Sequence, residues 1–341
     1  MKVAITGSSG LIGTAVAASL RGDGHQVLRL ARRPARQGGS AGTGASAGTG
    51  ASAGTGADAG RAAAGDDAVS GWDPDSVDGG LDPHAFTDVV AVVHLAGPGI
   101  ADRRWTAARK AAIRNSRVRG TRALATGLAR LDKPPATLLC ASAIGWYGDT
   151  RGHETDESAP PGTGFLADLV RDWEQAADPA RAAGIRTAQL RSGLVLASGG
   201  GTLGRLVPIF KLGFGIPLGS GRQYMSWISL ADEVGAVRFL LDRPGLAGPV
   251  NLTAPHPVTN SEFTAELNAA LGEPTVLRVP VSGFRLPGSV LHVPTPALEL
   301  ALGEVSGELL ASARVLPRRL LDAGYGFQHP DLSSALAAVL T

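Results

Sequence analysis

The chain has 341 residues, 44% of them hydrophobic, so it can bury a large core as one α/β domain with an appendage or as two lobes sharing a cleft. A formal net charge of +2 gives no support for nucleic acid or a membrane as the main partner, and the single cysteine, Cys140, excludes an internal disulfide framework. Because no leader-like segment precedes the first strand and no apolar run is long enough to span a bilayer, we expect a cytoplasmic protein.

The first predicted elements are a strand over residues 2–6, a glycine-containing turn and a helix whose apolar spacing continues to Leu20. Three glycines at this spacing allow a tight turn, let a pyrophosphate approach the amides at the helix N-terminus, and let the helix pack closely on the sheet. A loop without a ligand stays an alternative, but the flanking strand and helix favour a dinucleotide site. The residues expected to contact the dinucleotide are Gly7, Ser8, Ser9, Gly10, Leu11, Ile12 and Gly13.

A second strand is predicted over residues 26–30, and it ends in Ala31-Arg32-Arg33. An NAD enzyme usually places a carboxylate there for the ribose hydroxyl, whereas guanidinium groups suit a ribose 2′-phosphate through bidentate, charge-assisted hydrogen bonds. Arg32 and Arg33 therefore predict NADP(H) as the cofactor. The alternative is that they are two ordinary surface arginines.

Residues 38–60 repeat Ala-Ser-Ala-Gly-Thr-Gly with almost no variation. The repeat has no large apolar side chain whose burial could offset the entropy of ordering, so we expect a disordered insertion within a domain.

A nearly continuous apolar strand is predicted over residues 88–94, and its small-residue turn, Leu95-Ala96-Gly97, should border the cofactor cleft. The helix predicted over residues 105–124 carries a basic stripe. We interpret the stripe as a solvated face and not a nucleic-acid surface, because no aromatic residues alternate with it. Its members are Arg109, Lys110, Arg114, Arg117, Arg119 and Arg122.

The strand predicted over residues 136–142 ends at Ser142 and leads to Tyr147, and ligands bind beyond the carboxyl ends of parallel strands. Further elements follow at a helix over 165–177, a strand over 186–196, helices opening at Asp232 and at Thr259, a short strand over 276–279 and a tail helix after Pro330.

This alternation of strands and helices predicts an α/β fold: a Rossmann-type doubly wound parallel sheet with a smaller C-terminal α+β substrate lobe. The predicted NAD(P)-binding domain spans residues 1–250, with segments of the substrate lobe from about 200, and the C-terminal domain spans 251–341.

The sequence resembles the extended short-chain dehydrogenase/reductase superfamily of NAD(P)-dependent epimerases and dehydratases. It is similar, more narrowly, to an atypical "epimerase family" branch that ends in a small domain of unknown function. The segments that carry the resemblance are Gly7-x-x-Gly10-x-x-Gly13, 94–97, Gly120-Thr121, Tyr147-Gly148, 227–232, 100–105, 203–221, 251–255 and 314–317.

One departure from the superfamily concerns its Tyr-x-x-x-Lys pair, in which the phenol is the acid/base and the lysine lowers its pKa while holding the nicotinamide ribose. Between Lys133 and Lys211 this chain has no lysine, and Tyr147 is the only tyrosine. Arg117 stands where the superfamily has an asparagine. A phenol without a cationic neighbour keeps a pKa of about 10 and is a poor base at neutral pH.

A second departure makes a nucleotide sugar a poor expectation as substrate. Epimerases of the superfamily place an arginine for the diphosphate just before the Trp227-Ile228 position, where this chain has Met225-Ser226, although Arg222 lies near in sequence.

The remaining candidates for catalysis are Tyr147 as proton donor and Ser142 as the group that orients a carbonyl, with Arg191 or Arg222 supplying positive charge. The alternative for Tyr147 is a ring packed in the cleft wall. We interpret His94 as structural, and we expect no metal site. The nearby carboxylates, which we expect to be solvated turn residues, are Glu154, Asp156 and Glu157.

Two functions stay open. The chain is an NADP(H)-dependent oxidoreductase or epimerase-like enzyme that acts on a small carbonyl or hydroxyl compound, or it is a catalytically silent NADP(H)-responsive regulatory protein. In either case we expect a small-molecule ligand and neither nucleic acid nor a membrane, and a homodimer is compatible with the sequence.

Overall fold

The structure is a computed structural model that describes residues 1–33, 67–100, 104–272, 276–278, 285–287 and 292–340. The predicted disordered insertion at 38–60 lies outside these residues.

The centre of the molecule is a seven-stranded sheet with the order β10-β6-β5-β4-β1-β2-β3, in which all neighbouring strands are parallel. The order reverses between β1 and β4, and this switch point opens a crevice at the carboxyl ends of the strands. The predicted fold class is therefore confirmed. The strands are β1 (Lys2–Thr6), β2 (Gln26–Arg32), β3 (Ala68–Trp72), β4 (Val89–His94), β5 (Thr137–Ala143), β6 (Arg186–Ser192) and β10 (Gly248–Leu252).

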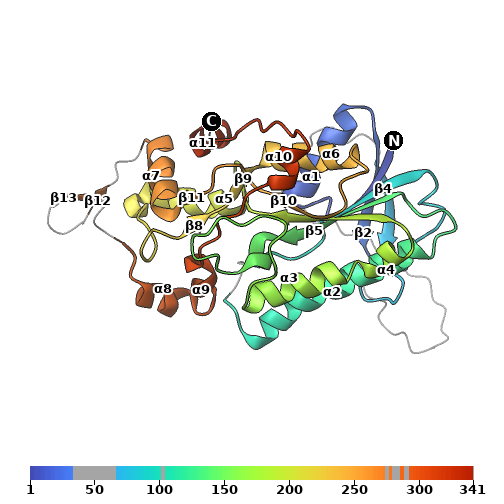
Figure 1. Ribbon diagram of the computed structural model, residues 1–341, viewed down its shortest axis with the longest axis horizontal. Helices are drawn as coiled ribbons and strands as arrows, with labels where there is room; N and C mark the ends of the chain where they lie inside the picture. The colour runs from blue at the N-terminus through green and yellow to red at the C-terminus, as the bar shows by residue number, and fades with distance from the viewer. Residues whose placement is uncertain (34–66, 101–103, 273–275, 279–284, 288–291, 341) are drawn as a thin grey trace, which may run out of the picture.

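Helices cover both faces of the sheet (Figure 1). On one face α1 (Leu11–Gly22) packs beside α6 (Leu230–Leu241), and on the other face lie α2 (Ala107–Ala129), α3 (Phe165–Gln175) and α4 (Asp178–Ala182). Side chains of a strand alternate between the two faces. In β1, Val3 and Ile5 accordingly join the core under α1 and α6, while Ala4 joins the core under α2.

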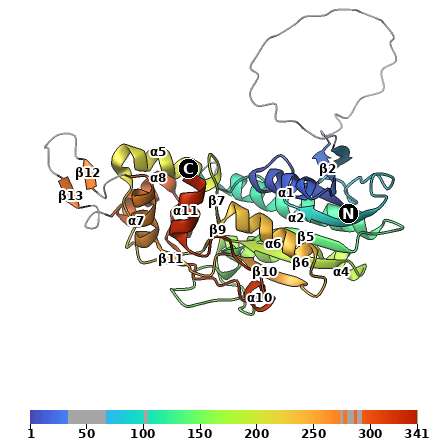
Figure 2. The same ribbon diagram turned by 90° about the horizontal axis from the view of Figure 1, so that it is seen from above.

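Of the remaining elements, η1 and α10 pack against the main sheet, and most of the others form a lobe at one end of the molecule. In this lobe α7, α8, β12 and β13 lie far from β2 (Figure 2). Its core includes Trp227, Phe263 and Leu336. The predicted Thr259–Glu262 capping box is present at the start of α7. These elements are η1 (Ile144–Tyr147), β7 (Leu194–Leu196), α5 (Gly201–Ile209), η2 (Phe210–Phe214), β8 (Tyr224–Met225), β9 (Trp227–Ser229), β11 (Val258–Thr259), α7 (Asn260–Ala270), β12 (Val276–Arg278), β13 (Arg285–Pro287), α8 (Thr295–Leu302), α9 (Val305–Leu310), α10 (Arg318–Asp322) and α11 (Leu332–Leu340).

The C-terminal part of the chain returns to the sheet after α9. Leu320 in α10 is fully buried in the same core as Val250 of β10. The Asp232 carboxylate then accepts the backbone N–H groups of Gln328 at 2.7 Å and His329 at 2.9 Å. The last segment is thus packed against β10 and α6 and also completes the lobe. In the part of the chain that the structure describes, no helix combines the length and the apolar character needed to cross a membrane.

Candidate functional site

The turn between β1 and α1 has a geometry that requires glycine at both ends. Gly7 has φ +67°, a conformation that other residues rarely adopt. A Cβ on Gly13 would lie 2.2 Å from the Gly7 carbonyl oxygen, so the helix begins in direct backbone contact with the turn. Between them Ser9, Gly10 and Leu11 are exposed. The Gly10 N–H is used within the turn, where it donates to the Gly7 carbonyl at 3.0 Å.

The N-terminus of α1 has no partner of its own. Gly10 is the N-cap and supplies no side-chain hydrogen bond, and the first turn contains no acidic residue. By contrast α2, α6 and α7 are each capped by a serine or threonine side chain. Unpaired N–H groups at the positive end of a helix dipole suit a pyrophosphate, so these residues fit a dinucleotide.

The turn after β4 lies against the glycine turn, as the sequence predicts for two walls of one cleft. A Cβ on Gly7 would lie 2.7 Å from the Leu95 carbonyl carbon. The Thr6 hydroxyl accepts the N–H groups of Leu95 at 3.1 Å and Ala96 at 3.3 Å. The structure therefore brings residues 7–13 and Leu95-Ala96-Gly97 together.

Three arginines lie in β2 or directly after it. Arg32 has an exposed side chain whose Nη2 lies 3.4 Å from the Asp75 carboxylate. Arg33 lies along Gly71, where an added Cβ would meet its Nε at 2.4 Å. The third, Arg29, is a residue that the sequence analysis missed: its Nε donates to the Ser8 hydroxyl at 3.2 Å. Strand alternation is the signal that could have found Arg29, because Leu28 and Leu30 face the opposite core.

The Ser142 side chain is part of a buried polar network. Residue pairing across β5, β6 and β10 places Ser142, Arg191 and Asn251 side by side in register. The Ser142 hydroxyl donates to Glu174 Oε1 at 2.6 Å, and Arg191 binds both carboxylate oxygens of Glu174, with Nε at 2.8 Å and Nη2 at 2.9 Å. A fully paired buried ion pair of this kind holds its members in one geometry.

Tyr147 joins the same network through its phenol. Its hydroxyl donates to Asn251 Oδ1 at 2.7 Å and accepts from Arg191 Nη1 at 3.0 Å. The Arg191 guanidinium also stacks over Trp146 at 3.9 Å from the ring centroid. Burial raises the pKa of Tyr147 to about 12, although the charge of Arg191 and its hydrogen bond act in the opposite direction. The phenol is therefore neutral at physiological pH. Its cationic neighbour is Arg191, one of the two arginines that the sequence suggests as a source of positive charge.

Two expectations about solvated charges are wrong. Glu157 is buried and accepts the N–H of Asn251 at 3.0 Å, and burial raises the pKa of its carboxyl. Arg117 is also buried, because α2 turns it toward the β4 turn and not toward solvent. Arg114, Arg119 and Arg122 are exposed, as predicted. Glu154 is exposed and pairs with Arg314 at 2.9 Å.

His94 has the structural role expected from its position. It is fully buried, with Nδ1 2.7 Å from the Thr6 hydroxyl and Nε2 3.0 Å from the Thr121 hydroxyl. Burial lowers its pKa to about 4, so the ring is neutral at physiological pH. Cys140 is buried in β5. Among the described residues no three His, Cys, Asp or Glu side chains are placed to hold a metal ion.

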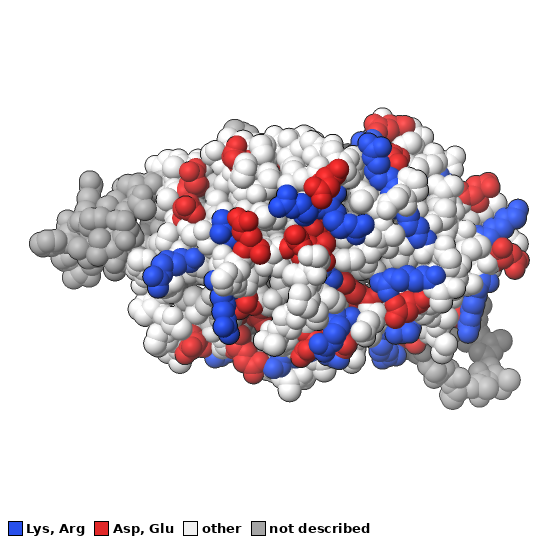
Figure 3. Space-filling model, viewed as in Figure 1, with Lys and Arg blue, Asp and Glu red and all other residues white. Residues whose placement is uncertain are grey.

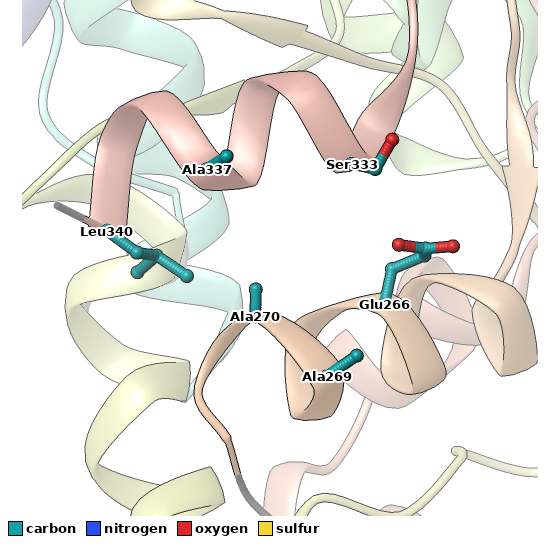
Figure 4. Close-up of a pocket in the computed structure, with 6 residues that line it drawn as sticks. All are labelled: Glu266, Ala269, Ala270, Ser333, Ala337 and Leu340. Carbon is teal, nitrogen blue, oxygen red and sulfur yellow. The ribbon is translucent and has the colours of Figure 1, made fainter.

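Two surface features lie outside this site. The face shown in Figure 3 has basic and acidic side chains interspersed, without a patch of one sign. A hollow of about 410 Å³ lies between α7 and α11 in the lobe, lined by the side chains labelled in Figure 4. These side chains are Glu266, Ala269, Ala270, Ser333, Ala337 and Leu340.

Comparisons with known proteins agree with this geometry. Residues 3–252 match the model of the NAD dependent epimerase/dehydratase family, and residues 293–339 match a domain of unknown function, DUF1731. The epimerase family protein Mb2239 of Mycobacterium bovis is 43% identical over 99% of this chain and 97% of its own. The cattle epimerase family protein SDR39U1 is 32% identical over 100% of both chains.

A solved structure is also similar over nearly the whole chain. The crystal structure of the human epimerase family protein SDR39U1, isoform 2, was determined with NADPH. It superposes with a TM-score of 0.77 at 28% sequence identity and covers 99% of each chain.

Proposed function

Because the chain belongs to the NAD dependent epimerase/dehydratase family, we propose that it is an NADP(H)-dependent oxidoreductase acting on a small carbonyl or hydroxyl compound. The observation that carries the proposal is the uncapped N-terminus of α1 above a turn that only glycine can form. The NADPH in the crystal structure of human SDR39U1 supports the same cofactor here.

Two parts of the cofactor have counterparts among the described residues. The exposed turn at residues 9–11 would hold the pyrophosphate, and the turn after β4 would form the opposite wall. Arg32 has an exposed guanidinium for a ribose 2′-phosphate, and Arg29 donates to the Ser8 hydroxyl of the glycine turn. Asp75 is its present partner across 3.4 Å at the surface, and such a contact is weak enough for a phosphate to replace.

When bound, the nicotinamide would supply or accept the hydride. Tyr147 is our candidate for the proton, because its phenol is neutral and Arg191 would stabilise negative charge left on the oxygen. To give up this proton to a substrate oxygen, the phenol must exchange its hydrogen bond to Asn251 for one to the substrate. Ser142 would require the same exchange at Glu174.

A second function is favoured by the hydrogen bonds that the Tyr147 and Ser142 hydroxyls already make. Both hydroxyl protons are used by protein acceptors, and the chain lacks a lysine in this region. A protein that binds NADP(H) and signals its presence without turnover would keep the cofactor cleft and have such a network as part of its core.

One experiment separates these functions. Calorimetry with NADPH and NADH tests the cofactor, and NADPH absorbance with a library of small aldehydes and ketones tests turnover. An enzyme binds NADPH and consumes it with at least one carbonyl compound, whereas a regulator binds NADPH and leaves the absorbance unchanged. If NADPH does not bind, the enzymatic and the regulatory function are both excluded.

A further inference from the structure

Arg117 is a buried cation without a counterion. Its side chain is nine-tenths buried, and Nη2 donates to the Pro98 carbonyl at 2.9 Å. Nη1 is buried with no hydrogen-bond partner, and no acidic side chain in the described ranges forms an ion pair with Arg117. The guanidinium packs over the Trp173 ring at 5.1 Å from its centroid.

Two other arginines in the same structure have guanidinium groups whose nitrogens all have hydrogen-bond partners. Arg191 binds both oxygens of Glu174 and the Tyr147 hydroxyl. Arg186 donates to Thr137 and to the carbonyls of Leu240, Arg243 and Leu246. A guanidinium has five N–H donors, and leaving them unpaired in a buried place is unfavourable. Arg117 differs from both in having a buried guanidinium nitrogen, Nη1, without a hydrogen-bond partner among the described residues.

A second arginine adds to the positive charge. Arg109 lies two turns earlier on α2, and its Nη2 donates to the Gly99 carbonyl at 2.7 Å, while its Nε is buried and unpartnered. Burial, together with the like charge of Arg109, lowers the pKa of Arg117 to about 10, so the Arg117 guanidinium stays charged at neutral pH. Arg109 and Arg117 thus hold the turn after β4, and no carboxylate of the described residues pairs with Arg117.

This cationic pair lies beside the cofactor cleft. A Cβ on Gly97 would lie 3.6 Å from Arg117 Cζ, and Gly97 ends the turn that packs against the glycine turn. On the other side Trp173 precedes Glu174, the carboxylate that holds Ser142 and Arg191.

We propose that Arg117, with Arg109, is an anion-binding site at the edge of the cleft that accepts a phosphate or carboxylate group. The proposal rests on the proposed function and adds to it the chemical class of one group that the cleft binds. The anion comes from one of two sources. It is a phosphate of the dinucleotide, or it is an anionic group of the substrate. Arg117 would bind either one through Nη1, which is buried without a partner, after a small shift of the groups around this atom.

The test compares three variants of the full-length chain. Arg117→Met keeps the packing volume over Trp173 without the charge. Arg117→Lys keeps the charge without the branched guanidinium. Arg122→Met is the matched control, because Arg122 is exposed on the same helix. Calorimetry measures the Kd of NADPH, and then the Kd of inorganic phosphate and of oxalate for the NADPH-loaded protein.

If the anion belongs to a substrate, Arg117→Met leaves the NADPH Kd within about twofold and weakens phosphate or oxalate binding at least tenfold. If the anion belongs to the cofactor, Arg117→Met weakens NADPH at least tenfold, and the loaded wild-type protein binds neither probe. In both cases Arg122→Met behaves as wild type and Arg117→Lys is intermediate.

The proposal is overturned if Arg117→Met binds NADPH, phosphate and oxalate with wild-type affinities. Failure of the wild-type protein to bind any nicotinamide phosphate would contradict the proposed function instead. Phosphate and oxalate binding to the free protein would then still decide the anion site, because Arg117→Met must abolish it.

Discussion

At the scale of single residues, two groups of side chains determine what the cleft can bind and transfer. Arg32 is exposed at the end of β2, where its charge is available to a ligand. Tyr147 is enclosed by Arg191 and Asn251, where its hydroxyl is both donor and acceptor. Mutations at these positions should therefore affect different properties of the protein.

Charge reversal at Arg32 should change cofactor preference. Arg32→Glu places a carboxylate near the ribose 2′-phosphate and removes a charge-assisted hydrogen bond of about 1.5–3 kcal/mol, so NADPH should bind at least tenfold more weakly while NADH changes little. Calorimetry with both cofactors measures this ratio. An unchanged preference for NADPH over NADH would show that Arg32 does not read the 2′-phosphate.

Removing the hydroxyl of Tyr147 should affect stability as well as activity. Tyr147→Phe leaves Asn251 Oδ1 and Arg191 Nη1 without their partner inside the protein, which costs about 1–3 kcal/mol of unfolding free energy. For an enzyme we also expect a loss of turnover of about 10²-fold or more, with NADPH affinity retained. Turnover equal to that of the wild type would exclude Tyr147 as the acid/base.

Several residues of this site could be predicted from the sequence. The others could not, because they reach the site through the packing of segments that are distant in sequence. Ser142 and Tyr147 follow a recognisable strand, so their position near the cleft depended only on local pattern. Glu174 and Asn251 reach the same point through the packing of α3 and β10, which are distant in sequence. The sequence suggests Arg191 or Arg222 as a source of positive charge, and it does not indicate that Glu174 pairs with Arg191.

At the scale of elements, two glycines of the turn between β1 and α1, Gly13 and Gly10, have different roles. Gly13 is needed for packing, because a Cβ there would lie 2.2 Å from the Gly7 carbonyl. A Cβ on Gly10 would meet one atom, the Gly7 carbonyl oxygen at 3.3 Å, a tight contact that a shift of a few tenths of an ångström relieves.

A pair of alanine variants should therefore behave differently. Gly13→Ala displaces α1 and lowers both the Tm and NADPH affinity. Gly10→Ala keeps the Tm within a few degrees of the wild type and weakens NADPH at least tenfold through a clash with the pyrophosphate. Thermal unfolding and calorimetry are measured on the same samples. If Gly10→Ala binds NADPH as well as the wild type, the pyrophosphate does not lie over this turn.

The elements themselves were largely predictable, because each buried strand is a short apolar run and each helix has a clear start. The strand β3 was missed. Its sequence, Ala-Val-Ser-Gly-Trp, places Val69 in solvent, and it is a strand because the exposed edge of β2 pairs with it. Such pairing is a tertiary effect that local propensity does not contain.

At the scale of the whole molecule, two buried ionisable groups should give the stability opposing dependences on pH. Burial raises the pKa of Glu233 from 4.5 to about 7, and its Oε2 has no partner while Oε1 accepts from Ser192 at 2.6 Å. Between these values only the unfolded chain ionises Glu233, so its contribution to stability falls as pH rises from about 4.5 to 7. His94, with its pKa lowered from 6.5 to about 4, is protonated first in the unfolded chain, so its contribution falls as pH decreases through this range.

Single variants should reveal each slope, since the two cancel over much of this range in the wild type. Relative to the wild type, Glu233→Gln should gain about 3 kcal/mol of unfolding free energy between pH 4.5 and 7. His94→Gln should show the opposite trend, with a relative loss of about 3 kcal/mol as pH rises from 4 to 6.5. Urea unfolding at half-unit steps of pH measures both, and parallel curves for all three proteins would contradict the assignment.

The return of α10 to the sheet also constrains how the protein is made. A ribosome completes β10 at Leu252 long before it adds Leu320, so the nascent sheet presents an uncovered apolar flank while the remaining residues are being synthesised. Exposed strands of this kind are sites at which incomplete chains aggregate or recruit chaperones. Folding of the domain built on the main sheet should therefore finish only after α10 has been synthesised, and its yield in cells should depend on translation speed and chaperone supply.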